Sequence, residues 1–143
     1  MTNEQNHPKS RITPKQINQL GENEVFVFGS NDAGRHYGGA ARIAVQKFGA
    51  IMGQGHGMQG NSYAIDSMSG IKNMKREIDT FCAFAKVHPE KHFLVTPIGC
   101  GIAGYQPEEI APLFMHCKDL ANVSLPSSFW EILSPPANKR QTD

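Results

Sequence analysis

At 143 residues the chain has the length of a single domain, and one hydrophobic core is expected. Apolar residues make up 39% of the sequence and charged residues 19%, with a formal net charge of +1, which excludes a disordered chain and disfavours a basic nucleic-acid binder. No apolar run reaches the roughly 20 residues that a bilayer-spanning helix needs. The start, MTNEQNHPKSRITPK, lacks a signal-peptide core, so we expect a cytoplasmic protein.

The cysteines and histidines are expected to play no role in crosslinking or metal binding. Cys82, Cys100 and Cys117 are odd in number, widely spaced and without a C-x-x-C pair, and disulfides are rare in a reducing cytoplasm. All three are therefore predicted to be thiols. No H-x-x-x-H or His/Cys pair stands at ligand spacing, so the sequence predicts neither a metal site nor a cofactor.

The two ends of the chain are polar and contain proline, which predicts disordered tails over 1–12 and 134–143 around a domain over 13–133. Thr13-Pro14 predicts a short helix that carries Ile17 and Leu20 and ends at Gly21. The run EVFVF at 24–28 is typical of a buried strand. From Gly38 to Gly49 the apolar spacing indicates a helix.

The second half of the chain continues the alternation of strands and helices. GQGHGMQG at 53–60 predicts a loop that either forms a flap over a site or is a plain solvent loop. SYAI at 62–65 and HFLVTPI at 92–98 predict strands, and apolar spacing of three and four from Ile71 to Ala85 predicts an amphipathic helix. Pro107 is expected to open a helix that reaches Leu120, and FWEIL at 129–133 to form a last strand.

This alternation predicts crossover units and therefore an α/β fold with a mainly parallel sheet covered by helices on both faces. In such sheets, ligands bind beyond the carboxyl ends of the strands. Two loops follow predicted strands with many glycines: SNDAGRHYGG at 30–39 and GCGIAGYQ at 99–106. We expect a ligand site between them.

The loop at 99–106 permits several interpretations. It fits G-x-G-x-x-G, but the next helix starts only at Pro107 and no strand with an acidic end follows, which disfavours a dinucleotide-binding turn. No Gly-Lys-Ser/Thr follows, as a Walker loop would require. The glycines either serve chain geometry alone or expose amides to a phosphate. Cys100 is either a nucleophile or a small residue whose amide faces the ligand.

The two loops together resemble those of the macrodomain family, whose members bind ADP-ribose and in some cases hydrolyse its esters or glycosidic links. The matching pieces are Asn31 with Gly38-Gly39-Ala40-Ala41, and TPIGCGIAGY at 96–105. The same V-F-G-S-N and G-C-G-I-A-G-Y patterns are similar to those of small uncharacterised bacterial and phage proteins. The resemblance implies a three-layer αβα macrodomain-like fold.

The resemblance also implies a set of site residues. A diphosphate would lie between the helix after Gly38-Gly39 and the second loop, Asn31 would hold the distal ribose and Tyr105 would flank it. The implied ligand-binding residues are Gly29, Ser30, Asn31, Gly38, Gly39, Ala40, Gly99, Cys100, Gly101, Ile102, Ala103, Gly104 and Tyr105.

Catalysis in such a site would need a group that activates or orients a water, for which Asn31, Asp32 and His36 are the candidates. Asp32 could equally serve to bond turn amides. The expected partner is an ADP-ribose-like nucleotide, either free or attached to an ADP-ribosylated macromolecule. No interaction with a membrane is expected. Two alternatives remain: a non-catalytic protein that senses or sequesters an NAD-derived metabolite, and glycine loops without nucleotide affinity.

Overall fold

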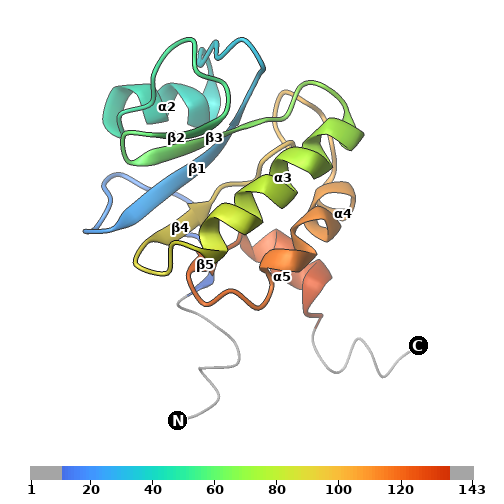
Figure 1. Ribbon diagram of the computed structural model, residues 1–143. Helices are drawn as coiled ribbons and strands as arrows, with labels where there is room; N and C mark the ends of the chain where they lie inside the picture. The colour runs from blue at the N-terminus through green and yellow to red at the C-terminus, as the bar shows by residue number, and fades with distance from the viewer. Residues whose placement is uncertain (1–10, 136–143) are drawn as a thin grey trace.

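Five strands form one sheet in the order β2-β3-β1-β4-β5 in the computed structural model, which describes residues 11–135 (Figure 1). The strands are β1 (Glu24–Ser30), β2 (Gly57–Gln59), β3 (Ser62–Asp66), β4 (His92–Val95) and β5 (Val123–Ser124). β1 pairs in parallel with β3 and with β4, and β4 pairs in parallel with β5. Only the edge strand β2 is antiparallel to its neighbour. The predicted α/β fold with a mainly parallel sheet is confirmed.

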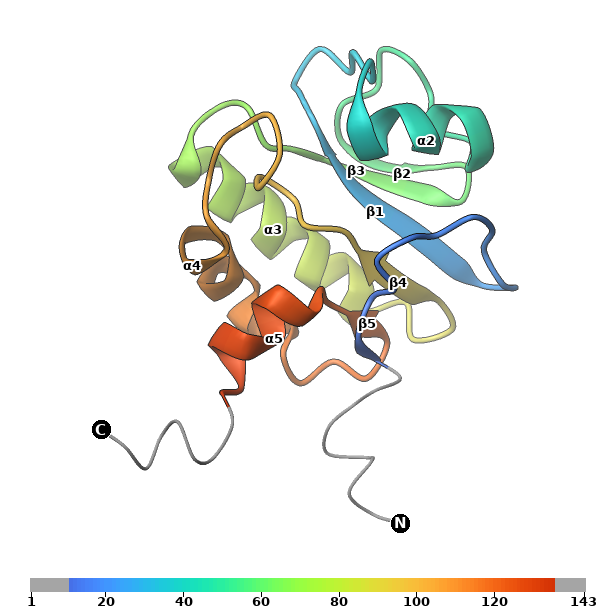
Figure 2. The same ribbon diagram turned by 180° about the vertical axis from the view of Figure 1, so that it is seen from behind.

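Helices cover both faces of this sheet because β1 is apolar on both sides. Phe26 and Phe28 point toward α2 (Gly39–Lys47), whereas Val25 and Val27 belong to the larger core on the opposite face. That face carries α3 (Ile71–Lys86), α4 (Pro107–Ile110), the 3-10 helix η2 (Ala111–Cys117) and α5 (Ser127–Leu133). Figures 1 and 2 show α2 alone on its side of the sheet.

Several helices and strands lie at the residues for which they were predicted. β1, β3, α2 and α3 match the predicted segments, and β1 extends two residues further, to Ser30. β4 is shorter than predicted and ends at Val95. Thr96 still donates its amide to the Val27 carbonyl at 3.1 Å, but Pro97 has no amide to continue the ladder.

Two predicted elements are wrong. The segment 13–20 is not helical, because the Thr13 amide donates to the Leu125 carbonyl at 2.9 Å and Ile12 forms a bridge to Leu125, which extends the chain at the sheet edge. The segment 129–133 lies in helix α5 rather than in a strand. Phe129, Trp130 and Leu133 have helical spacing, and all three are buried in the core. The last strand, β5, comes earlier and was missed.

Two further segments are only partly as predicted. The helix from Pro107 continues as a 3-10 helix after four residues. Pro112 lies in this second part, where it cannot donate an i→i−4 hydrogen bond. The predicted loop at 53–60 ends in strand β2, and Gln59 within it is buried.

The predicted disordered tails lie outside the described residues except for 11–12 and 134–135. Arg11 belongs to the domain: its Nε donates to the Val123 carbonyl at 2.9 Å, and its guanidinium lies 4.9 Å from the Trp130 ring centre. Within residues 11–135, no helix combines the length and the apolar content needed to cross a membrane.

The prediction of three thiols is wrong for two of the cysteines. Cys82 of α3 and Cys117 of η2 form a disulfide, with their Cα atoms 5.6 Å apart, and only Cys100 is a free thiol. The two residues are 35 positions apart in sequence, yet each lies on the buried face of its helix, and these two helices pack against each other. Sequence spacing carries no information on this proximity.

Reduction of this disulfide is expected to lower the free energy of unfolding by about 2–4 kcal/mol, because the crosslink restricts the unfolded chain. Urea unfolding followed by the fluorescence of Trp130, with and without dithiothreitol, measures the change. The Cys100→Ser variant, which keeps the disulfide, serves as the background and excludes mixed disulfides. An unchanged midpoint on reduction would contradict the crosslink's contribution.

Candidate functional site

A cleft of about 480 Å³ opens at the carboxyl ends of β1, β3 and β4. These three strands are neighbours and parallel, so their ends and the loops that follow them meet at one edge of the sheet. The N-terminus of α2 closes the cleft on one side. The lining residues are Gly29, Ser30, Asn31, Arg35, Tyr37, Gly38, Gly39, Ala40, Ala41, Ser67, Met68, Thr96, Pro97, Ile98, Gly99, Gly101, Ile102 and Ala103.

One wall of the cleft is the first turn of α2. Its N-cap residue is Gly38, and no side chain caps the helix. Among residues 11–135, the amides of Ala40 and Ala41 donate no hydrogen bond to another residue. The first amides of a helix lack intrahelical acceptors and carry the positive end of the helix dipole. This wall therefore offers donors and positive potential to an anion.

The opposite wall is the loop after β4. The Gly104 amide donates to the Gly101 carbonyl at 2.9 Å, and the Tyr105 amide donates to the Gly99 carbonyl at 2.9 Å. These turn bonds leave the amides of Gly101, Ile102 and Ala103 without an acceptor in the described part of the chain. The Ile102 side chain is 93% exposed, so the loop presents backbone rather than core residues to the cleft.

Most of the predicted ligand-binding residues line this cleft. They are Gly29, Ser30, Asn31, Gly38, Gly39, Ala40, Gly99, Gly101, Ile102 and Ala103. Three predicted residues, Cys100, Gly104 and Tyr105, are not among the lining residues. Cys100 and Tyr105 pack partly against the core on the α3 side of the sheet. The expected place of Tyr105 beside a ribose stays a prediction.

Of the three candidate catalytic residues, only Asn31 lines the cleft. Its side chain closes the first loop: Oδ1 accepts the Arg35 amide at 2.8 Å, and Nδ2 donates to the Arg35 carbonyl at 3.1 Å. His36 is 2% exposed, and Asp32 does not line the cleft but accepts a hydrogen bond from His56.

The buried ring of His36 is engaged on both sides. Nε2 lies 2.9 Å from the Ile51 carbonyl, which can only accept, so Nε2 carries the proton and Nδ1 accepts from the Ser30 hydroxyl at 2.7 Å. Nε2 also lies 3.2 Å from Oε1 of Gln59. The ring thus ties the loop after β1 to the segment before β2 and is not available to a substrate.

Sequence reasoning missed several lining residues. Ser67 and Met68 follow β3, and the rule about carboxyl strand ends could have found them once the strand at 62–65 was predicted. Arg35 and Tyr37 lie within the first predicted loop, and Arg35 adds a positive charge to the cleft.

A second hollow of about 660 Å³ adjoins the first and shares Gly39, Ala40, Thr96 and Pro97 with it. It lies between the first part of α2 and the segments 13–18 and 126–128. The two hollows meet at the N-terminus of α2. Their arrangement accommodates an elongated ligand with a part on either side of that helix end.

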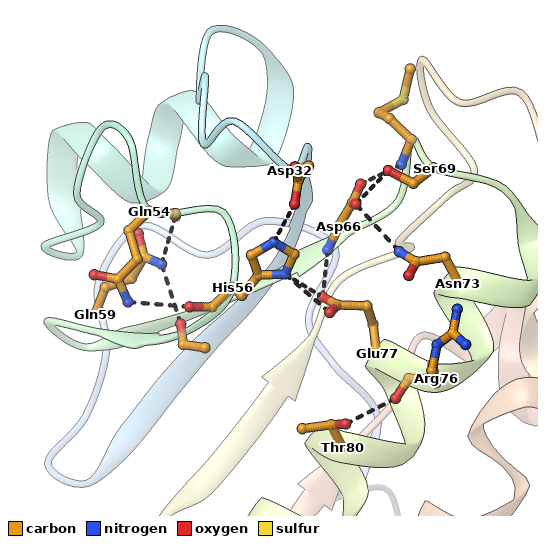
Figure 3. Close-up of polar contacts among 12 residues, drawn as sticks. Asp32, Gln54, His56, Gln59, Asp66, Ser69, Asn73, Arg76, Glu77 and Thr80 are labelled. Atoms are coloured by element: carbon orange, nitrogen blue, oxygen red, sulfur yellow. Dashed lines mark hydrogen bonds and ion pairs between the residues drawn. The ribbon is translucent and has the colours of Figure 1, made fainter.

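Asp32, His56, Asp66 and Glu77 form a polar cluster (Figure 3). It lies beside the first cleft, because Asn31 and Ser67, the chain neighbours of Asp32 and Asp66, line that cleft. His56 donates from Nε2 to Oδ1 of Asp32 at 2.8 Å, and its Nδ1 lies 3.0 Å from both oxygens of Glu77. The hydrogen bond with Glu77, followed by that with Asp32, raises the pKa of His56. Asp66 stands next to them: ligand atoms of Asp32, His56 and Asp66 lie within 4.8 Å of one another.

The free thiol has the wrong environment for a nucleophile. Desolvation, followed by the negative charges of Glu108 and Glu109, raises the pKa of Cys100. These two carboxylates lie in the first turn of α4, and their charge adds to the effect of burial.

Iodoacetamide at pH 7 is expected to modify one thiol of the native protein, Cys100, and to do so more slowly than it modifies glutathione. The raised pKa leaves less thiolate, which is the reactive form. Mass spectrometry of the time course measures the rate, with Cys100→Ser as the unlabelled control. A rate above that of glutathione would contradict the direction of the shift.

The charged form of His56 is expected to stabilise the fold at low pH. Because its folded pKa is raised above 6.5, this contribution is fully present below pH 6.5 and is lost as the pH rises through the folded value. In EDTA, the melting temperatures of the wild type and His56→Gln should differ most near pH 5 to 6 and converge at higher pH. His116→Gln replaces a histidine outside the cluster and controls for general charge effects. A pH-independent difference would refute the assignment.

Comparisons with protein-family models, with curated proteins and with solved structures gave no match for this chain.

Proposed function

We propose that the cleft binds ADP-ribose or a related NAD-derived nucleotide, with the diphosphate between the N-terminus of α2 and residues 101–103. One observation carries this proposal: Ala40 and Ala41 line one side of the cleft and Gly101, Ile102 and Ala103 the other, and the amides of all five lack an acceptor within residues 11–135. Unpaired backbone donors grouped in this way are the chemistry that binds phosphate oxygens.

The electrostatics of the cleft support an anionic ligand. Among the residues that the structure describes, no aspartate or glutamate lines the cleft, whereas the guanidinium of Arg35 and the helix dipole of α2 both favour negative charge. Arginine also forms paired hydrogen bonds with phosphate oxygens.

The two adjoining hollows support a ligand with two ends. A diphosphate at the N-terminus of α2 would leave one ribose in the first cleft and extend the nucleoside toward the second hollow, along Ile17 and Ile43. The resemblance of the two loops to those of macrodomains agrees with this placement, and we propose a macrodomain-like three-layer arrangement for residues 13–133.

The position of the catalytic candidates favours binding without turnover. Asp32 lies outside the cleft and is engaged with His56, and His36 is buried with both ring nitrogens bonded. Asn31, the remaining candidate, cannot act as a base because its amide does not titrate in the physiological range. We therefore propose a binding protein for the nucleotide first and an ADP-ribosyl hydrolase second.

Calorimetry with ADP-ribose, AMP and NAD tests the proposal. ADP-ribose is expected to bind more tightly than AMP, because AMP lacks the diphosphate and the second ribose that would extend the ligand across both hollows. The absence of heat and of any thermal shift with all three nucleotides would reject nucleotide binding. Incubation with an ADP-ribosylated peptide distinguishes binding from hydrolysis: loss of the label at catalytic protein concentrations would exclude pure binding.

The substitution Gly101→Leu is expected to weaken ADP-ribose binding at least tenfold, a loss of about 1.4 kcal/mol or more. A Cβ at Gly101 meets no atom within 4 Å, so the fold has room for the side chain, which would occupy the space in front of the amides. Calorimetry of the folded variant measures the loss. Ala83→Leu on the exposed side of α3, away from the cleft, is the matched control. Unchanged affinity in folded Gly101→Leu would overturn the diphosphate position.

A further inference from the structure

We propose that Asp32, His56 and Asp66 bind a divalent transition-metal cation beside the cleft, with Glu77 orienting the histidine. The proposal does not depend on nucleotide binding. The three residues come from the loop after β1, the segment before β2 and the end of β3, and nothing in their sequence spacing connects them.

The distances fit one ion. The ligand atoms of the three side chains lie within 4.8 Å of one another. Ligands of such cations stand about 2.0–2.4 Å from the metal, so two ligands of one ion are at most about 4–5 Å apart. A cation can therefore reach all three side chains with small changes in their rotamers.

His56 has the hydrogen-bonded carboxylate partner that is typical of metal-binding histidines. Nδ1 lies 3.0 Å from Glu77, and Oε1 of Glu77 also accepts the Asp66 amide at 3.0 Å, which fixes the carboxylate (Figure 3). A carboxylate on one ring nitrogen orients the ring and makes the other nitrogen a better ligand. That other nitrogen, Nε2, faces Asp32. A cation would take the place of the Nε2 proton, which would leave to solvent.

The charge of the cluster is not balanced by the protein. Within the described part of the chain, no lysine or arginine forms an ion pair with Asp32, Asp66 or Glu77, so three carboxylates surround one imidazole. Asp66 is only 1% exposed, and a buried carboxylate is costly without a counter-charge. A divalent cation would supply that charge.

Asp66 is already fixed for such a role. Its carboxylate accepts hydrogen bonds from the Ser69 hydroxyl at 2.5 Å, the Met68 amide at 3.0 Å and Nδ2 of Asn73 at 3.3 Å. A carboxylate has about four acceptor positions, so one is left for a metal.

The donor set indicates the class of cation. Two carboxylates and an imidazole suit Mn²⁺, Fe²⁺, Co²⁺ or Zn²⁺, whereas Mg²⁺ and Ca²⁺ prefer oxygen ligands alone. Asn31 and Ser67, the chain neighbours of Asp32 and Asp66, both line the cleft, so the cation would stand at its rim.

Titration of the metal-free full chain with Mn²⁺, in the absence of nucleotide, tests the proposal. Calorimetry, and the decrease of the electron paramagnetic resonance signal of free Mn²⁺, are expected to show one bound ion per chain. Asp32→Asn and His56→Gln should each weaken binding at least tenfold, and Glu77→Gln by about 10- to 100-fold. Asp32 and His56 are exposed, so these variants should fold. Asp79→Asn removes a carboxylate of the same helix as Glu77 but outside the cluster, and should leave the affinity unchanged.

Either of two binding results would overturn the proposal, and so would one spectroscopic result with Co²⁺. One is the absence of saturable binding of Mn²⁺, Co²⁺ and Zn²⁺, which would mean that the cluster is only a hydrogen-bonded link between loops. The other is equal affinity in the wild type, Asp32→Asn and His56→Gln. Co²⁺ also identifies the site: a thiolate charge-transfer band would place the metal at Cys100 instead.

Discussion

The parallel pairing of β1 with β3 on one side and β4 on the other is the constraint on which the candidate site depends. Val27 is aligned with Tyr63 on one neighbour and Val95 on the other, so three strands end at the same edge of the sheet. Two further hydrogen bonds join these ends. The Ser67 amide donates to the Ser30 carbonyl at 3.0 Å, and the Thr96 hydroxyl donates to the Val27 carbonyl at 2.7 Å. Both walls of the cleft are positioned by this alignment.

The first loop keeps its shape through contacts made away from the cleft. The buried ring of His36 links it to Ile51 and Gln59, and a Cβ on Gly55 would collide with the carbonyl oxygens of Asn31 and Asp32. The segment before β2 therefore supports the loop from behind, and it also carries His56. The cleft and the polar cluster thus share one scaffold, with the loop after β1 contributing residues to each.

The sequence predicted those elements whose pattern lies within one short segment of the chain, and it did not predict features that depend on contacts between distant segments. The apolar runs of β1 and β3 and the helical spacing of α2 and α3 are local signals. They predicted the sheet edge at which the cleft lies and most of the residues that line it. The helix at 127–133 was mistaken for a strand because FWEIL is rich in aromatic and branched residues, although its burial follows helical spacing. The disulfide, the burial of His36 and the cluster around His56 arise from contacts between distant segments, and sequence patterns do not encode them individually.

The free donors of the cleft belong to the backbone, and this has a consequence for how the chain can evolve. Replacement of Ile102 or Ala103 by another residue other than proline leaves the backbone N–H in place. Most substitutions there therefore do not remove a hydrogen-bond donor. What a mutation can do is obstruct them, by adding bulk at a position such as Gly101 where a Cβ meets open space. Selection for open amides would therefore keep glycine at such positions. Related chains would then retain these glycines while the neighbouring residues vary.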